Sequence, residues 1–194
     1  SYSGEENAVA DVLKCFMRQK QFDDFCTDKY GNVIGKIKGD RTGNKVLFDG
    51  HMDTVPADNK EAWKHDPFVP VVEDGKLYGR GTSDMKGAMA AFFCAAAYFM
   101  EDHGKDFAGE IYTAGVVHEE CFEGVAARSI SELVNPDYVV VGEGRSYSLD
   151  TLTKATNLVL AGAKLIGANS DVSGPIENGI APACRALIAP IEMA

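Results

Sequence analysis

The stretch KVLFDGHMD at residues 45–53 joins an apolar strand signal to polar side chains suited to a site. Residues 45–48 are typical of a β-strand, and this strand delivers His51 and Asp53. Side chains two positions apart on a strand share a face. A ligating imidazole usually donates its other ring N–H to an oxygen, so His51 is a candidate metal ligand and Asp53 the residue that orients it. For this pattern alone, the alternative is a capped turn that carries a surface histidine.

Three further carboxylates follow glycine-rich or apolar segments. Asp84 lies after glycines 79 and 81 and opens an apolar helix, where a carboxylate can bridge two cations. Its alternative role is that of a helix N-cap. Glu119 and Glu120 end a predicted strand and should face opposite ways, so one could bind a metal while the other acts as a general base. The alternative is a solvated pair without partners.

Glu143 follows the all-apolar strand 138–141, at the place where open α/β sheets put ligand-binding residues. Its alternative role is an acid stabilised by a helix N-terminus. Each of these signals is weak alone. Their shared position at strand ends predicts a two-metal hydrolytic site, because an α/β sheet gathers its strand ends at one edge.

The periodicity of apolar residues predicts strands alternating with helices. We expect helices at about 5–19, 85–100, 123–133, 149–161 and 182–192, and strands at 33–37, 45–48, 69–72, 76–78, 110–117, 138–141 and 164–168. The segment Ser3–Glu6 has a capping-box pattern, and Gly87 indicates a close approach of its helix to the sheet. The order predicts an α/β fold for residues 1–194, a three-layer sandwich with a mostly parallel, mixed sheet and helices on both faces.

The composition narrows the class of protein. The chain has 194 residues, 45% of them hydrophobic and 25% charged, which is typical of a globular protein. Its net charge of −10, without a basic cluster, argues against nucleic acid as a partner. Five scattered cysteines indicate reduced thiols and a cytoplasmic location. The longest apolar run, residues 87–100, is too short to span a membrane, and no signal-peptide pattern is present.

Residues 1 to about 143 resemble the co-catalytic zinc aminoacylase and carboxypeptidase family, which includes acetylornithine deacetylase, succinyl-diaminopimelate desuccinylase and peptidase T. The matching stretches are 1–6, 30–33, 50–56, 63–68, 79–87, 118–120 and 141–143. The resemblance implies zinc, for which cobalt or manganese could substitute, and hydrolysis of an amide or peptide-like bond. It also implies a strained peptide bond after Asp84.

The same resemblance implies a role for each candidate residue. His51 and Glu143 would each hold one metal, with Glu120 on the other. Asp84 would bridge the metals, Asp53 would orient His51, and Glu119 would be the general base. Compared with the family, this chain lacks a preceding helix, the lid domain after Glu143 and a last histidine ligand, since no histidine follows His118.

Residues from about 136 to 194 resemble instead the cap domain of haloacid-dehalogenase-like phosphatases. The stretch 136–142 suits both families, so the chain looks like a chimera: a zinc-peptidase-like fragment, 1–143, followed by a cap-like α-β-α segment, 144–194, that completes the sheet. The aspartate nucleophile motif of those phosphatases is absent.

The function predicted from sequence is therefore that of a chimeric or truncated scaffold from a two-zinc amidohydrolase. We expect it to be catalytically inactive, with a residual divalent-metal site that holds one zinc ion weakly. The alternative is an active zinc-dependent hydrolase of N-acyl amino acids or small peptides. Without the lid, no recognition groups for a small-molecule substrate are evident. A monomer is expected, because the family's dimer surface is missing.

Overall fold

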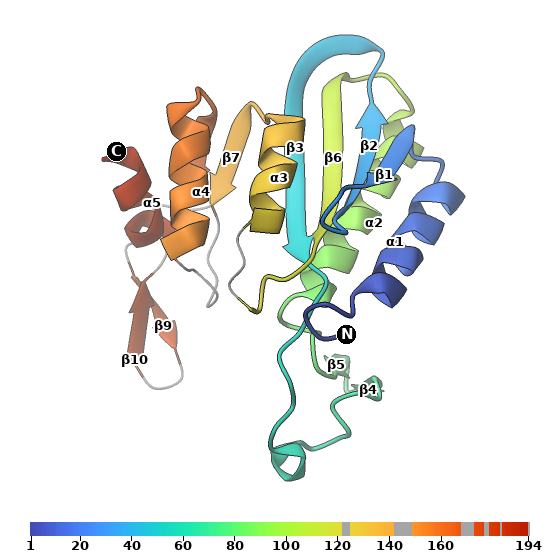
Figure 1. Ribbon diagram of the computed structural model, residues 1–194, viewed down its shortest axis with the longest axis vertical. Coiled ribbons are helices and arrows are strands. Elements are labelled where there is room, and N and C mark those ends of the chain that lie inside the picture. Colours follow the sequence, from blue (N-terminus) through green and yellow to red (C-terminus); the bar gives the residue numbers. More distant parts are fainter. Residues whose placement is uncertain (122–124, 142–148, 168–172, 177–178, 183, 194) are drawn as a thin grey trace.

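The computed structural model describes residues 1–121, 125–141, 149–167, 173–176, 179–182 and 184–193. Its central sheet has the strand order β1-β2-β6-β3 (Figure 1). These strands are β1 (Asp24–Thr27), β2 (Val33–Lys38), β3 (Arg41–His51) and β6 (Ala108–Val116). β3 and β6 are parallel, whereas β1 and β6 each pair antiparallel with β2.

The mixed sheet of the predicted α/β fold is confirmed, but parallel pairs form a smaller part of this sheet than predicted. The reason lies in the connections. A short turn joins β1 to β2 and imposes antiparallel pairing, whereas the chain between β3 and β6 passes through a helix and can return in parallel.

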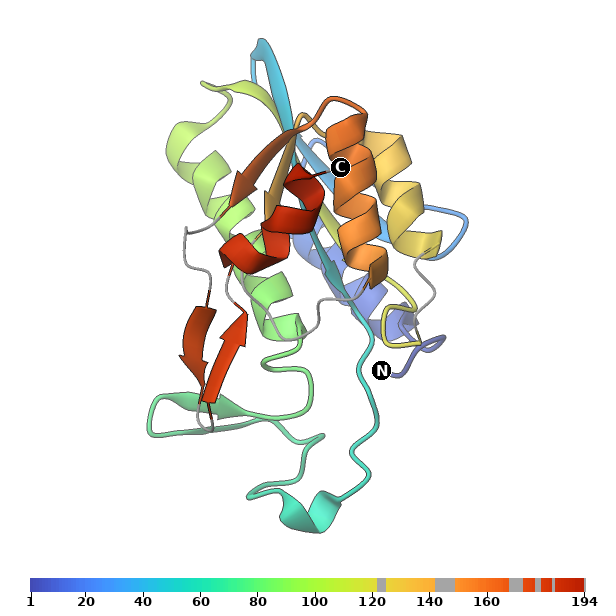
Figure 2. The same cartoon turned by 90° about the vertical axis from the view of Figure 1, so that its left-hand side faces the viewer.

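The C-terminal part contains two small two-stranded sheets and two helices. β7 (Tyr138–Val141) pairs in parallel with β8 (Lys164–Gly167), and β9 (Ser173–Ile176) forms a hairpin with β10 (Gly179–Pro182). α4 (Leu149–Leu160) packs against α5 (Cys184–Glu192), as Figure 2 shows. β7 begins beside β3, where the Lys45 N–H donates to the Asp137 carboxylate at 2.7 Å. The predicted boundary at residue 143 lies outside the described residues, so the domain division stays a prediction.

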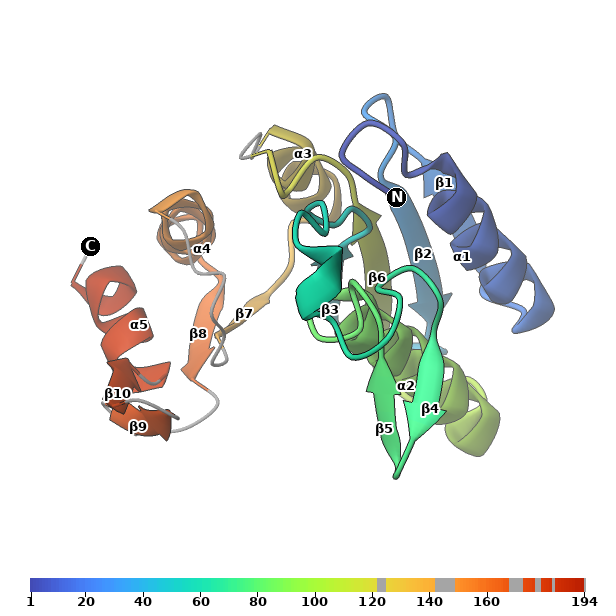
Figure 3. The ribbon, with the colours of Figure 1, turned by 90° about the horizontal axis from the view of Figure 1, so that it is seen from below.

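Helices cover both faces of the central sheet, which confirms the three-layer arrangement. α1 (Asn7–Gln19) and α2 (Lys86–His103) lie on one face, and α3 (Val125–Val134) lies on the other (Figure 3). In α1 the apolar residues recur every three or four positions, so one stripe, Ala10, Leu13 and Met17, is buried.

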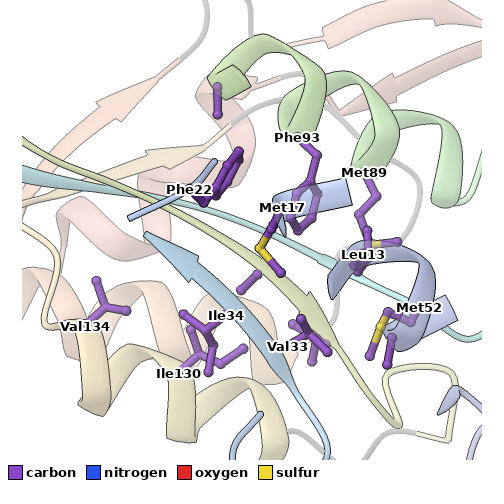
Figure 4. Packing of buried hydrophobic residues seen from close by; sticks show 14 of the residues in the cluster. Leu13, Met17, Phe22, Val33, Ile34, Met52, Met89, Phe93, Ile130 and Val134 are labelled. Carbon is purple, nitrogen blue, oxygen red and sulfur yellow. The ribbon is translucent and has the colours of Figure 1, made fainter. Parts of the chain in front are cut away.

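The hydrophobic core lies between these helices and the sheet. Leu13 and Met17 of α1 meet Met89 and Phe93 of α2 (Figure 4). Gly35 on β2 permits this packing, because a Cβ there would lie 2.2 Å from the Met17 sulfur. Each such side chain contributes about 1.5–3 kcal/mol through burial. The core thereby anchors the strands whose ends carry the candidate site.

α2 differs from its prediction in one respect. Its composition, apolar on nearly every face, predicted a buried helix, but burial is restricted to one face with Met89, Phe93, Ala96 and Ala97. The opposite face, including Ala91 and Ala95, is exposed. Small alanine side chains expose little apolar area, which reduces the cost of this exposure.

The segment between β3 and α2 extends below the sheet (Figure 1). It contains a 3-10 turn, η1 (Lys60–Ala62), and the hairpin of β4 (Val71–Glu73) and β5 (Lys76–Tyr78). The strands predicted near 69–72 and 76–78 are present and pair as a hairpin, with positive φ at Asp74 and Gly75 as a tight turn between twisted strands requires.

Two expectations from composition can be compared with the described residues. Cys15, Cys26, Cys94 and Cys121 are free thiols. Among the helices that the structure describes, none has both the length and the apolar content to cross a bilayer.

Candidate metal site

Four segments meet at the lower end of the central sheet (Figure 1). They are the end of β3, the loop before α2, the turn after β6 and the N-terminal residues 1–6. β3 and β6 run in parallel, and His51 is in register with Val116, so both strands end at the same edge. Residues distant in sequence are thereby gathered at this edge.

His51 lies at the centre of this site with a side chain that is 4% exposed. Its Nε2 is 3.0 Å from the Asp84 Oδ1 and 3.8 Å from the Glu119 Oε2. Its Nδ1 is 3.0 Å from the main-chain oxygen of Asp53 and 3.4 Å from the Asp53 Oδ1. One ring nitrogen therefore faces Asp53, and the other faces the remaining carboxylates.

The segment that carries Asp84 packs against β3 at Gly50. A Cβ on Gly50 would lie 2.7 Å from the Met85 Cε, so the end of that side chain occupies the space beside the glycine. The peptide bond between Asp84 and Met85 is cis. The N-cap alternative for Asp84 is wrong: Met85 caps α2, without a side-chain hydrogen bond.

Asp53 is fully buried and connects the segments of the site. Its Oδ2 accepts hydrogen bonds from the Ser3 hydroxyl at 2.6 Å and from the Glu120 N–H at 3.0 Å. Its Oδ1 accepts from the Glu119 N–H at 3.3 Å. Asp53 thus joins the His51 ring to the turn that carries both glutamates.

The electrostatics of His51 and Asp53 are those of a buried ion pair. Burial disfavours the imidazolium, but the hydrogen bonds to Asp53 and Asp84 and the charge of Glu119 outweigh it and raise the pKa of His51 to about 9. Burial would also raise the pKa of Asp53. The hydrogen bonds from His51, Ser3 and the Glu120 N–H outweigh that effect and hold this pKa well below its ordinary value.

The pKa values of the two glutamates are raised, whereas that of Asp53 is lowered. Burial raises the pKa of Glu119, and the charges of Glu120, Asp53 and Asp84 add to this increase while His51 opposes it. Burial likewise raises the pKa of Glu120. A cation placed among these groups would relieve their mutual repulsion.

Within the described residues, the donor atoms of His51, Glu119 and Glu120 lie within 4.8 Å of one another. One imidazole nitrogen with carboxylate oxygens is a donor set that suits zinc. The Nδ1 of His51 is held by Asp53, as the uncoordinated nitrogen of a ligating histidine usually is held by an oxygen acceptor. The residues therefore fit the metal that the resemblance implies. Glu143, the remaining predicted ligand, lies outside the described residues.

The sequence of this chain is similar to that of known proteins. A match to the Peptidase family M20/M25/M40 covers residues 47–175, more than half of the chain. The chain belongs to this peptidase family. The match extends past residue 143, where the resemblance was predicted to end.

Two M20 relatives illustrate the match. The succinyl-diaminopimelate desuccinylase of Methylobacillus flagellatus is 40% identical over 113 residues, which are 54% of this chain and 29% of that protein. The M20 family metallo-carboxypeptidase Sso-CP2 from Sulfolobus solfataricus has the same fold, with a TM-score of 0.58 at 21% identity over 74% of this chain and 35% of that chain. The chain spans less than a third of the length of the first curated relatives that it matches.

A further match, which covers 30% of this chain, is to a phosphatase. The p-nitrophenylphosphatase Bs-TpNPPase is 39% identical over that part, which covers 23% of the phosphatase chain. Its TM-score of 0.30 is too low to support a statement about fold. The resemblance of residues 136–194 to a phosphatase cap stays a prediction.

Two local expectations about the site are wrong. Ser3–Glu6 is not a capping box: the Ser3 hydroxyl donates to Asp53, and the Glu6 carboxylate accepts from the His118 N–H at 3.1 Å. Glu119 and Glu120 do not alternate as strand residues, because β6 ends at Val116 and His118 has a φ of 60°. Both glutamates can then face His51.

Gly87 also differs from its prediction. A Cβ at this position would lie 2.1 Å from the carbonyl oxygen of Thr82. The glycine therefore permits a close approach to the preceding loop rather than to the sheet. The functional residues that sequence reasoning missed are Ser3 and Glu6. Their stretch was part of the family resemblance, but the capping pattern gave them a purely local role.

Proposed function

We propose that this chain forms the metal-binding part of a zinc-dependent hydrolase that cleaves an amide bond. His51 and Glu120 would hold the cation, with Asp84 beside the Nε2 of His51. The convergence of His51, Glu119 and Glu120 donor atoms within 4.8 Å carries this proposal. A bound zinc ion would polarise the carbonyl of a substrate and lower the pKa of water.

Glu119 is proposed as the general base. Burial raises its pKa, which makes its carboxylate a better proton acceptor near neutral pH. Its N–H is held by Asp53, so the side chain projects from a fixed backbone. Asp53 would orient the His51 ring and stabilise it electrostatically.

The proposed substrates are N-acyl amino acids or small peptides. Two similar proteins support this class: one relative is a desuccinylase, and one structural neighbour is a metallo-carboxypeptidase. The first name denotes removal of a succinyl group and the second denotes removal of a C-terminal residue.

A second candidate is a metal-binding scaffold without turnover. It is supported by the small donor set, because the described group contains one imidazole. A site with few donors binds its metal more weakly. In that case one zinc ion would bind and no substrate would be hydrolysed.

Isothermal titration with zinc chloride, followed by an assay on N-acetyl amino acids, distinguishes the two candidates. Tight zinc binding with turnover that Glu119→Gln abolishes supports the hydrolase. Zinc binding without turnover supports the scaffold, and absence of zinc binding contradicts both. Glu61→Gln, an exposed carboxylate in η1, is the matched control and should change neither result.

The monomeric state and the chimeric origin are further proposals. Sedimentation equilibrium tests the monomeric state, and a dimer mass would contradict it.

The chimeric origin is supported by the stretch 136–142, which suits both families that the chain resembles. A fusion would be supported by DNA sequencing of independent isolates that reads through codons 136–144, together with relatives whose similarity to this chain stops at that junction. Relatives whose identity to this chain continues evenly through the junction would contradict a fusion.

A further inference from the structure

Glu6 is a buried carboxylate that the proposed chemistry does not use. Its side chain is 4% exposed and lies at the start of α1, and its Oε1 accepts a hydrogen bond from the backbone N–H of His118 at 3.1 Å. The two residues are 112 positions apart in sequence. Since burying a carboxylate is costly, a specific contact of this kind calls for a role.

The turn after β6 is held by side chains at four consecutive backbone N–H groups. The N–H of Val117 donates to the buried Asn32 Oδ1 at 3.0 Å, and that of His118 donates to Glu6. The next two N–H groups, of Glu119 and Glu120, donate to Asp53. The direction of both glutamate side chains thus depends on three acceptors from other segments.

The N-terminal residues also contact the end of β3. The Ser3 hydroxyl donates to the Asp53 Oδ2 at 2.6 Å. The main-chain oxygen of Ser1 accepts from the N–H of Thr54 at 3.0 Å. Residues 1–6 therefore connect the segment that carries His51 to the turn that carries Glu119 and Glu120.

We propose that Glu6 and Ser3 are positioning residues of the metal site. Glu6 fixes the turn through the His118 N–H, and Ser3 fixes the Asp53 carboxylate that orients His51. This inference rests on the proposed function in that the site is taken to bind zinc. Outer contacts of this kind typically contribute about 10- to 100-fold to metal affinity.

The first test compares zinc affinities of the full 194-residue chain by isothermal titration. Glu6→Ala should weaken zinc binding by about 10- to 100-fold. Glu6→Gln should stay within about threefold of the unchanged chain, because an amide oxygen still accepts the His118 N–H. Glu5→Ala removes the same charge from the exposed neighbouring residue and should have no effect. Equal affinities for Glu6→Ala and the unchanged chain would overturn the inference.

A second readout does not depend on metal. Amide hydrogen exchange in the metal-free protein should be faster at residues 118–120 in Glu6→Ala and unchanged in Glu6→Gln. If the unchanged chain binds no zinc, the proposed function fails, while the exchange rates still decide whether Glu6 holds the turn. Unaltered exchange in Glu6→Ala would show that it does not.

Ser3→Ala and Ser3→Thr form a milder pair for the case in which Glu6→Ala does not fold. Ser3→Ala should weaken zinc binding by about tenfold and alter the visible spectrum of the cobalt-loaded protein, because the geometry around His51 changes. Ser3→Thr keeps the hydroxyl and should restore both readouts. An unchanged spectrum and affinity in Ser3→Ala would refute the role of Ser3.

Discussion

The β3–β6 pair and the β7–β8 pair are both parallel, but their surroundings differ. Helices on both faces enclose the sheet that contains β3 and β6, in a core that extends from Leu13 to Val134. Beside β7 and β8, a second cluster in the described residues has two buried side chains, Ile188 and Ile191, with partly buried residues from α4 around them. The metal-site candidates lie at the end of the well-packed pair.

This difference shows why the site is where it is. Ligands must be held within fractions of an ångström, and a dense core restricts the strands that carry them. His51 is the last residue of β3, which pairs in parallel with β6, a strand whose C-terminal half is buried. We therefore expect perturbations of the central sheet to reach the site and perturbations of the β7–β8 region to leave it intact.

Removing the Phe93 ring should have the largest effect. Phe93 is 2% exposed in the central core, so Phe93→Ala should lower the free energy of unfolding by about 3–5 kcal/mol. Urea denaturation followed by circular dichroism measures this change. Ile191→Ala is the comparison in the second cluster. If both variants unfold in the same single transition and lose equal free energy of unfolding, the two regions form one cooperative unit and do not differ in stability.

The metal-free protein should lose stability as the pH rises from about 6.5 to about 9. Below this window both folded and unfolded states carry a proton on His51. Within it the folded state keeps the proton and the unfolded state releases it, so unfolding becomes easier by on the order of 3 kcal/mol in total. Denaturation midpoints at pH 6 and pH 9 measure the effect. His51→Gln should flatten this dependence, and a steep slope in that variant would point to another group.

Gly87→Ala should destabilise the protein by about 1–3 kcal/mol, because the added Cβ would lie 2.1 Å from the carbonyl oxygen of Thr82. The loop that carries Asp84 must then shift, so zinc affinity should fall as well. Ala88→Ser, at an exposed position on the same helix, is the control and should stay within about 0.5 kcal/mol. A neutral Gly87→Ala would mean that the loop before α2 adapts freely.

The smallest expected effect tests whether the metal site is independent of the β7–β8 region. Ile191→Ala should leave the zinc dissociation constant within about twofold, because Ile191 packs in the second cluster with α4 residues. Isothermal titration measures this constant. A large loss of affinity would show that the β7–β8 region supports the site and would remove the distinction between the two regions.

Much of the fold was predictable because its signals are local. The helical spacing of apolar residues at 5–19 indicated α1, the apolar run before His51 indicated β3, and the apolar stretches at 69–72 and 76–78 indicated β4 and β5. Strand ends gather at one edge of such a sheet, so the grouping of His51, Asp84 and Glu119 could also be expected. The antiparallel share of the sheet was underestimated, because periodicity does not specify strand order.

By itself, the sequence determined most of the segments that become helices and strands and the side chains at their ends, because short-range periodicity and turn chemistry encode both. The strands β9 and β10 were not among those predicted. The tertiary structure alone decided how those side chains are held. Ser3 meets Asp53 across 50 positions and Glu6 meets His118 across 112, and such hydrogen bonds form only after the core has brought the segments together. The same residues had a plausible local use as a helix cap, and packing selected the distant partners instead.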